Sequence, residues 1–483
     1  NIVDVTPANT YAAGKGFDYI YKGRPDRSFL FRKANQGLEQ TIDMHADEGG
    51  TMPPATQPQL TDVEKEMIRQ WVLYGAPQNG EVVEEQLIED YYGGMGLASF
   101  DAPPPAPDPS EGFQIKMGPF YLEPQGQPKD ELEYFLKYEL DMPEDVDVDR
   151  IDMKISPSSH HLIVYAFDPP VFAQLIDPGL RLEANHSAID LVAAIQESTD
   201  LRLPETTAFT WQNDMILDLN SHYINYSASQ VLQAEAYINI YTKEAGSAEH
   251  EMKTELIVKP DIPIPNNANT IEYSDIEASN SYGEIFIWGI MGHTHKYGTS
   301  YKAYKRVNGQ QDEIIYDAAC SDGAPGCVSP FFDYQHIPMR YFEPLLPMDM
   351  TNGNGLIHTA SWLNDGPFPV NFGPTSDDEM MVLVLMYTDE QIGDPVSNNE
   401  ITNEPSLKIY PNPMDELALL ELPERGSTYN FRLYDVLGKE VRSVDRIETS
   451  DWLLERGSLG SGMYVYVVLG EDGERYTGKL LIE

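Results

Sequence analysis

Short apolar runs separated by Gly, Pro and Asn fill the chain from Gly112 to about Ile392. Runs of about four to eight residues between turn residues are typical of antiparallel sheets. The first set of predicted strands covers residues 115–121, 133–140, 150–155, 161–167, 214–220 and 236–241. The second set covers residues 253–258, 284–290, 300–305, 313–316, 355–362 and 380–387. We expect a mainly β chain with two tandem antiparallel jelly-roll-like β-sandwiches and one interior helix over Ala188–Glu197.

The pattern changes at both ends of this β region. A small helical segment, residues 1–80, ends in a predicted helix that begins at the Thr61–Glu64 capping box and stops at Gly75. The next stretch is acidic and then Pro-rich, which indicates a linker. The expected order is therefore helical segment 1–80, linker 81–110, sandwiches 111–246 and 247–392, linker 393–406, and a C-terminal β unit 407–483.

Composition narrows the choice of partners. The chain of 483 residues is 41% hydrophobic and 11% aromatic, so it can bury several cores. Its 78 acidic and 32 basic residues give a net charge of −46. Such a charge repels nucleic acid and anionic membranes, and we exclude both as partners. The sequence contains no run of about 18 apolar residues, so we expect no transmembrane segment.

The two cysteines, Cys320 and Cys327, lie in a loop that also contains Gly, Pro and Asp. Two cysteines are too few for a disulfide framework. We favour one local disulfide between them, and two free buried thiols are the alternative.

Five of the ten histidines lie at the ends of predicted strands. They are His160, His161, His222, His293 and His295. On a strand, residues i and i+2 point to the same face, so His293 and His295 can share a metal ion. Adjacent histidines such as His160 and His161 face opposite sides of a flat strand, so a shared ion requires a twist or a bulge there. Each motif alone fits unrelated polar residues, but the five together indicate metal binding.

The order of these motifs resembles the copper type II, ascorbate-dependent monooxygenases, the family of peptidylglycine α-hydroxylating and dopamine β-monooxygenases. The matching motifs, within roughly residues 112–389, are His160-His161, His222-Tyr223, His293-Thr-His295 and Asp378-Glu-Met380. The resemblance implies two copper ions, one held by His160, His161 and His222 and the other by His293, His295 and Met380. It also implies that the second site is catalytic, binding dioxygen and removing hydrogen from a substrate C–H bond, while the first stores an electron. A thioether ligand favours Cu(I), the state that meets dioxygen.

Two positions depart from the peptide-amidating members of that family. Met291 stands where those members have an Arg that clamps the substrate carboxylate, and Val384 stands where they have a Tyr that contacts the peptide. A buried carboxylate without polar partners is costly, so we expect no peptide amidation. The substrate, a small molecule or another compound, is left open.

Residues 1–80 resemble the C-terminal part of secreted c-type cytochrome domains. The matching segments are Gly23–Leu30, Met52-Pro-Pro54 and Trp71–Pro77. The resemblance implies that Met52 is an axial haem ligand. The CxxCH motif that binds haem covalently does not occur in this sequence, so haem c is expected only if that motif lies upstream of residue 1. Otherwise Met52 is a loop residue.

The C-terminal β unit, residues 407–483, resembles the type A sorting domain of type IX secretion. The matching motifs are Tyr410-Pro-Asn-Pro413 and Leu433-Tyr-Asp-Val-Leu-Gly-Lys439. The resemblance implies a β-sandwich that addresses the chain to the type IX secretion machinery of a Bacteroidetes-type bacterium. The protein is then secreted or attached to the cell surface, outside the outer membrane.

The expected function is that of a secreted copper-dependent monooxygenase, which hydroxylates a C–H bond of an unknown substrate with dioxygen and a reductant. The alternative is a non-catalytic cell-surface protein that binds copper or transfers electrons.

Overall fold

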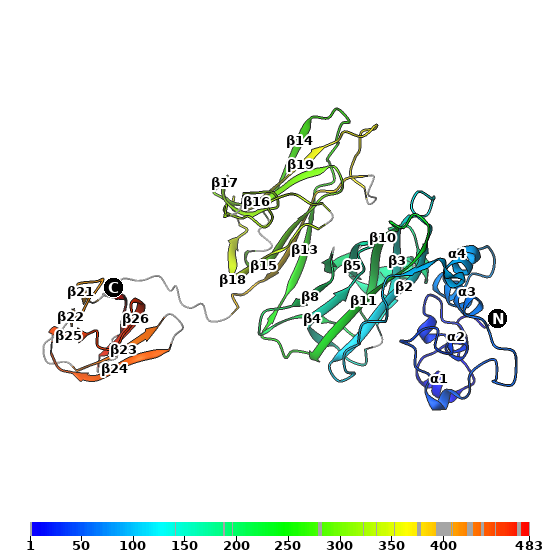
Figure 1. Ribbon diagram of the computed structural model, residues 1–483, viewed down its shortest axis with the longest axis horizontal. Helices are drawn as coiled ribbons and strands as arrows, with labels where there is room; N and C mark the ends of the chain where they lie inside the picture. The colour runs from blue at the N-terminus through cyan, green and yellow to red at the C-terminus, as the bar shows by residue number, and fades with distance from the viewer. Residues whose placement is uncertain are drawn as a thin grey trace. The chain divides into compact units, whose positions relative to one another are not determined.

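The computed structural model divides the chain into two compact units, Asn1–Ile392 and Gly393–Glu483 (Figure 1). In the first unit it describes residues 2–392 apart from 141, 187–188, 196, 279–282, 322, 335, 352 and 374–377. In the second it describes residues 407, 409–422, 428–435, 439–449, 451–470 and 475–482. The predicted linker 393–406 lies outside the described residues. Strands predominate in both units, which confirms the mainly β character that the hydrophobic pattern predicts.

The first unit begins with a small helical segment. Its elements are α1 Thr10–Gly14, η1 Pro25–Arg27, α2 Phe29–Asn35, η2 Ala46–Glu48 and α3 Asp62–Leu73. Helix α3 has the predicted capping box, in which Thr61 Oγ1 accepts the Glu64 N–H at 3.2 Å and the Glu64 carboxylate accepts the Thr61 N–H at 2.8 Å. It ends before Gly75, whose φ of +81° and close approach to the Pro178 carbonyl leave no room for a side chain.

The first half of the predicted linker 81–110 is structured, so this part of the linker prediction is wrong. It forms α4 Glu85–Asp90, a π-helical turn η3 Tyr91–Met95 and a short strand β1 Gly96–Ala98. Leu87 and Ile88 are buried against Tyr121 and Val231, and β1 pairs in parallel with strand β11. Two adjacent apolar residues within an acidic stretch are enough to anchor this segment to the neighbouring sheet.

Two sheets, the first sheet pair, follow and enclose one hydrophobic core. Their strands are β2 Gly112–Leu122, β3 Glu131–Glu139, β4 Val146–Lys154, β5 Ser159–Phe167, β6 Leu180–Arg181, β7 Ile189–Ile195, β8 Thr199–Arg202, β9 Thr207–Trp211, β10 Ile216–Ile224, β11 Val231–Glu244 and β12 His250–Glu251. One sheet has the order β1-β11-β4-β9-β12, with β2 and β8 at its sides, and the other has the order β6-β3-β10-β5-β7. Because β12 pairs with β9, this sheet pair ends a few residues after the predicted boundary at 246.

The predicted helix over Ala188–Glu197 is wrong, since its described residues form strand β7. The run Ile189-Asp-Leu-Val-Ala-Ala-Ile195 contains helix-forming alanines, which favoured the helical interpretation. In the fold it pairs antiparallel with β5 and places Ala193 and Ile195 in the core, so sheet pairing overrides local propensity.

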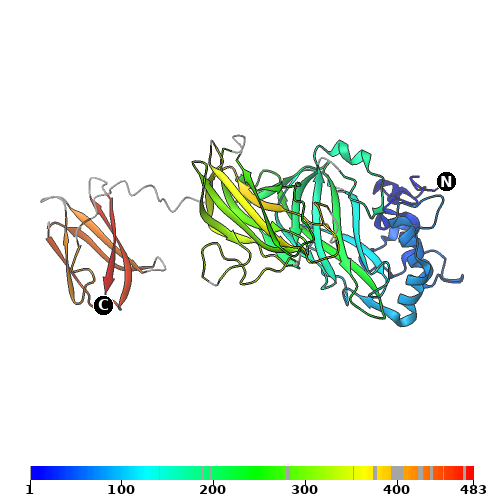
Figure 2. The same ribbon diagram turned by 90° about the horizontal axis from the view of Figure 1, so that it is seen from above.

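The second sheet pair continues the first unit. Its strands are β13 Lys253–Val258, β14 Thr270–Glu277, β15 Glu284–His293, β16 Gly298–Val307, β17 Gln310–Asp317, β18 Arg340–Asp349, β19 Gly355–Leu363 and β20 Val382–Thr388. The sheet orders are β13-β20-β15-β18 and β14-β19-β16-β17, around a core that includes Ile287, Leu383 and Trp362. These strands are the green to yellow arrows in Figure 2. The two sheet pairs touch directly, because Trp288 and Met386 pack into the core of the first pair and the Thr254 hydroxyl donates to the Leu191 carbonyl.

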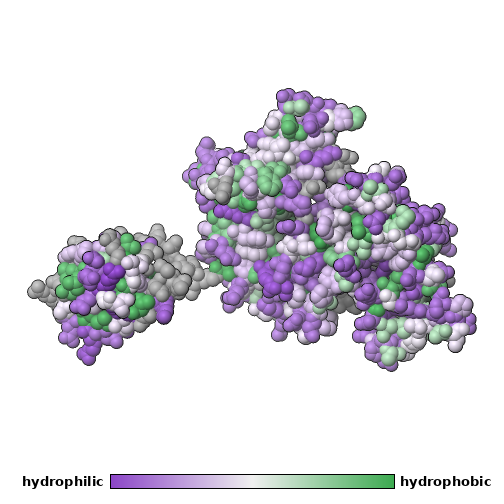
Figure 3. All heavy atoms as spheres, viewed as in Figure 1, coloured by the Kyte–Doolittle hydropathy of each residue, from purple (hydrophilic) through white to green (hydrophobic). Residues whose placement is uncertain are grey.

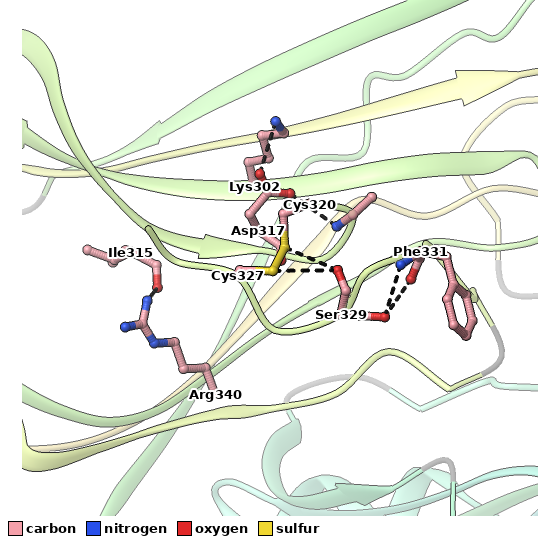
Figure 4. Close-up of a disulfide and its surroundings, with 9 residues drawn as sticks. Lys302, Ile315, Asp317, Cys320, Cys327, Ser329, Phe331 and Arg340 are labelled. Carbon is pink, nitrogen blue, oxygen red and sulfur yellow. Dashed lines mark hydrogen bonds and ion pairs between the residues drawn. A yellow bond between two sulfur atoms is a disulfide. The ribbon is translucent and has the colours of Figure 1, made fainter. Parts of the chain in front are cut away.

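A loop of the second sheet pair holds both cysteines. Cys320 and Cys327 form a disulfide, with their Cα atoms 5.6 Å apart (Figure 4). Two ionic or polar contacts flank the loop, from Lys302 to Asp317 at 3.1 Å and from the Arg340 guanidinium to the Ile315 carbonyl.

The C-terminal unit has its own core. Its strands are β21 Ile409–Tyr410, β22 Leu417–Glu421, β23 Tyr429–Asp435, β24 Glu440–Ile447, β25 Asp451–Glu455, β26 Gly462–Gly470 and β27 Arg475–Ile482. They form the sheets β21-β22-β25 and β24-β23-β26-β27. Leu420, Phe431 and Val468 are fully buried between them.

On the face shown in Figure 3, the described residues present mostly hydrophilic side chains, with small groups of apolar ones between them. No helix in the described part of the chain has the length and apolar character that a membrane crossing requires.

Candidate metal centre

A β-bulge in β5 brings three predicted ligands together. His222 of β10 pairs with His161, and the next residue, Tyr223, pairs with Ser159, so His160 is left without a cross-strand partner. A bulge of this kind turns one extra side chain toward its neighbour. The Nδ1 atoms of His160 and His161 consequently lie 3.2 Å apart, although adjacent residues of a flat strand would face opposite sides.

The three imidazoles of His160, His161 and His222 form a compact donor set. Each can offer a ring nitrogen such that all three nitrogens lie within 4.8 Å of one another. His161 Nε2 contacts the Asn220 side-chain oxygen at 2.9 Å, and His222 Nε2 lies 3.0 Å from the Glu131 carboxylate. Since these contacts occupy the Nε2 atoms, the Nδ1 atoms of both rings are the nitrogens that remain for a metal ion.

Glu133 and Asn220 support the ring of His161. Asn220 donates to the Glu133 carboxylate at 2.9 Å, and that carboxylate lies 3.3 Å from His161 Nε2. Carboxylates and amides behind a ligating histidine fix its ring orientation and tautomer. Glu131, Glu133 and Asn220 were not among the site residues predicted from the sequence. Asn220 stands two residues before His222 on the same strand face, which was a usable signal, whereas the pairing of β3 with β10 that places the glutamates was not readable.

Burial keeps His160 neutral. Burial, followed by the neighbouring rings of His161 and His222, lowers the pKa of His160 to about 3. The buried Nε2 of His160 also has no hydrogen-bond partner among the described residues. A neutral imidazole is the form that binds a metal ion, so this donor set fits a metal that prefers nitrogen ligands, such as copper or zinc.

The second group lies where β15 ends. The ring centroids of His293 and His295 are 5.2 Å apart, as expected for residues i and i+2. His295 Nδ1 donates to the Asp378 carbonyl at 3.2 Å, which leaves its Nε2 for a metal ion. Burial lowers the pKa of His295 to about 4. Burial and then the rings of His295, His161 and His160 lower the pKa of His293.

Met380 lies beside these histidines, just before β20. It lines the same cavity as His293 and His295 and packs at the edge of the second core. Two imidazoles and a thioether make a softer donor set than three imidazoles, and such a set suits Cu(I).

Glu379, which was not among the site residues predicted from the sequence, holds this second group in place. The fully buried carboxylate accepts the N–H groups of His295 at 2.8 Å and Tyr297 at 2.6 Å, and the indole N–H of Trp362 at 2.8 Å. Burial raises the pKa of Glu379 to about 7, against the opposing effect of these donors. Glu379 directly precedes Met380, so its side chain ties the His293–Tyr297 turn to the segment that carries this methionine.

A cavity of about 210 Å³ borders both groups. Predicted ligands from both groups line it, namely His161, His293, His295 and Met380. The rest of the wall is largely apolar and includes Met291 and Val384, the two positions that depart from the peptide-amidating pattern. A larger cavity of about 700 Å³ lies between the helical segment and the first sheet pair, and none of its lining residues is a predicted metal ligand.

Met52 lies apart from both groups. Its side chain is 49% exposed, its N–H donates to the Lys33 carbonyl at 2.9 Å, and its carbonyl accepts from the Gln36 side chain at 3.1 Å. These contacts describe a loop residue tied to α2. The haem site stays a prediction, and nothing below depends on it.

The C-terminal unit matches a known family. The family described as "Secretion system C-terminal sorting domain" matches residues 408–483. The C-terminal unit is therefore a type IX sorting domain, which directs the protein through that secretion machinery to the outer surface or the medium. No curated protein matches the chain.

Similarities to solved structures are weak. A structure described as the STIV MCP shares 11% identity with a TM-score of 0.24, over 59% of this chain and 95% of that one. The BSP domain of a biofilm-associated protein shares 10% with a TM-score of 0.14, over 78% and 84%. A β-glucuronidase of Parabacteroides merdae shares 8% with a TM-score of 0.12, over 45% and 28%. At such scores none of them bears on the fold or the function of this chain.

Proposed function

We propose that residues 111–392 form a two-copper monooxygenase, built on two tandem jelly-roll-like β-sandwiches, that hydroxylates a C–H bond of a mostly apolar substrate. The observation that carries the proposal is the shared cavity. His161 of the three-imidazole group and all three members of the two-imidazole, one-thioether group line one substrate-sized space. Copper bound there would supply one-electron redox chemistry with dioxygen at the softer group and electron storage at the harder one.

The protein's own residues position these groups. Asn220 and Glu133 orient His161, Glu131 orients His222, and Glu379 orients the turn that carries His295. Apolar side chains such as Met291, Val384 and Leu191 line the cavity and exclude water from it. The same side chains give a substrate carboxylate no partner, so a glycine-extended peptide is not the expected substrate.

Metal analysis of the purified protein tests the proposal. Under reducing conditions we expect the unmodified protein to bind two coppers per chain. The variants His160→Ala and Met380→Ala should each bind one. His45→Ala replaces an exposed histidine and is the control that should still bind two. Oxygen uptake in the presence of a reductant should accompany the two-copper form and be lost in Met380→Ala.

The outcomes separate the alternatives. Two coppers without oxygen uptake would favour a non-catalytic copper-binding or electron-transfer protein. A chain that binds no copper, with His160→Ala indistinguishable from the unmodified protein, would contradict both. Turnover of a glycine-extended peptide would contradict the inference drawn from Met291 and Val384.

A further inference from the structure

The cavity wall contains one more histidine, His186, which belongs to neither predicted ligand group and to none of the sequence motifs. It precedes β7, is mostly buried, and lines the cavity shared by the two donor groups. Its Nδ1 lies 2.6 Å from the carboxylate of Asp218, a fully buried residue of β10. A carboxylate only accepts hydrogen bonds, so Nδ1 carries the proton.

The surroundings hold this pair firmly. The Arg181 guanidinium donates to the same Asp218 oxygen and also to the Asn185 side chain, at 2.8 Å in the second case. The rings of Phe135 and Tyr165 meet the imidazole edge-on, with centroids 5.6 and 5.1 Å away. Asp218 is thus an orienting residue, and His186 has little freedom to turn.

The tautomer decides what His186 offers to the cavity. With the Nδ1 proton committed to Asp218, Nε2 is the ring nitrogen left to accept a hydrogen bond from the cavity. The described residues give Nε2 no partner of its own. The other polar groups of the wall are differently engaged: Glu133 and Asn220 bond to each other and to His161, and three further histidines are predicted metal ligands.

We propose that His186 is a specificity-determining residue that accepts a hydrogen bond, at Nε2, from a hydroxyl or N–H group of a small and otherwise apolar substrate. A cavity of about 150 Å³ holds a benzene molecule. The 210 Å³ here therefore suit a molecule of one ring with a short substituent. The inference rests on the proposed function only in calling this ligand the substrate; the binding preference follows from the cavity itself.

Two isosteric probes test the preference on copper-free protein. Benzyl alcohol carries a hydroxyl where ethylbenzene has a methyl group, and dissociation constants for both are measured by ligand-observed NMR. We expect His186→Phe to weaken the binding of benzyl alcohol relative to that of ethylbenzene by about 3- to 10-fold, which corresponds to the loss of one hydrogen bond. His45→Phe, an exposed histidine outside the cavity, should leave the ratio unchanged. Val384→Phe, which narrows the cavity, should weaken both probes.

A spectroscopic signature tests the role of Asp218. In the unmodified protein the ring nitrogens of His186 should show the proton on Nδ1, and Asp218→Asn should shift the population toward the other tautomer. The ratio of the dissociation constants of benzyl alcohol and ethylbenzene should change in the same direction as in His186→Phe. A merely structural role for Asp218 would leave the tautomer unchanged and would overturn this part.

The remaining outcomes are also decisive. An unchanged probe ratio in folded His186→Phe, or no binding of either probe to the unmodified protein, would overturn the proposal. A loss of copper from His186→Phe would make His186 a metal ligand and would overturn it as well. Absence of copper from the unmodified protein would contradict the proposed function while leaving the probe preference intact, so the two failures are distinguishable.

Discussion

At the scale of single residues, buried carboxylates orient other functional groups in this protein. Glu379 serves three donors around the second group, and Asp218 serves His186 and Arg181. A buried carboxylate is costly unless such partners satisfy it, and each partner is in turn fixed by the bond. The predicted ligand His295 and the cavity residue His186 are therefore positioned by carboxylates that are not themselves predicted ligands.

Replacement of Glu379 tests this arrangement. Glu379→Ala leaves the N–H groups of His295, Tyr297 and Trp362 buried without an acceptor, and each costs about 1–3 kcal/mol. We expect the free energy of unfolding of the second sheet pair to fall by about 3 kcal/mol or more, measured by urea denaturation. Glu284→Ala, an exposed residue at the start of β15, is the matched control and should change it by less than about 0.5 kcal/mol. Equal effects in both variants would show that Glu379 has no special role.

At the scale of elements, an ionic cluster fastens the helical segment to the first sheet pair. Glu39 accepts from Arg69 of α3 at 2.7 Å and from Lys116 of β2. Burial disfavours the charged carboxylate, but Lys116 and Arg69 outweigh it and lower the pKa of Glu39 to about 2. The Gln70 side chain adds a bond to the Pro119 carbonyl at 2.8 Å.

This cluster predicts an acid-sensitive attachment. Because the folded pKa lies below the ordinary value, the stabilisation is present above about pH 4.5 and is lost as the pH falls toward 2. A shift of this size corresponds to on the order of 3 kcal/mol. Glu39→Gln should be less stable than the unmodified protein at pH 6, and the two should converge near pH 2, as followed by hydrogen exchange in α3. Parallel curves at every pH would rule out this contribution.

The sequence predicted elements and motifs better than their partners. His293 and His295 could be placed together because strand periodicity relates i and i+2, and the α3 capping box follows from two residues three apart. The bulge at His160 is a consequence of the register between β5 and β10, which local sequence does not encode. His186 and Asp218 are brought together by the pairing of distant strands, and β7 shows an alanine-containing run adopting the conformation that its neighbours impose.

At the scale of the whole molecule, the sorting domain and the candidate metal centre belong to different compact units. The sorting domain has its own buried core, and all predicted metal ligands belong to residues 1–392. Each unit should therefore keep its property without the other.

Truncation after Ile392 tests this separation. In a bacterium with type IX secretion, we expect the truncated chain to accumulate inside the outer membrane, while its copper content matches that of the full chain. Residues 393–483 fused to a periplasmic reporter should carry that reporter to the surface or the medium, as cell fractionation would reveal. Export of the truncated chain, or a loss of copper from it, would contradict this division of roles.

The Cys320–Cys327 bond has a consequence for tracing the route of the protein. Disulfides form in oxidising compartments such as the periplasm and are rare in the cytosol. These two cysteines are the only ones in residues 1–483, so the peptides that carry them should escape thiol alkylation in a chain that has left the cytoplasm. In a precursor retained there, the same two cysteines should take up two molecules of the reagent. A loop this short is worth about 2–3 kcal/mol to the folded state. Protein made in a reducing cytosol would thus lack part of its stability, and alkylation stoichiometry read by mass spectrometry would report where each molecule matured.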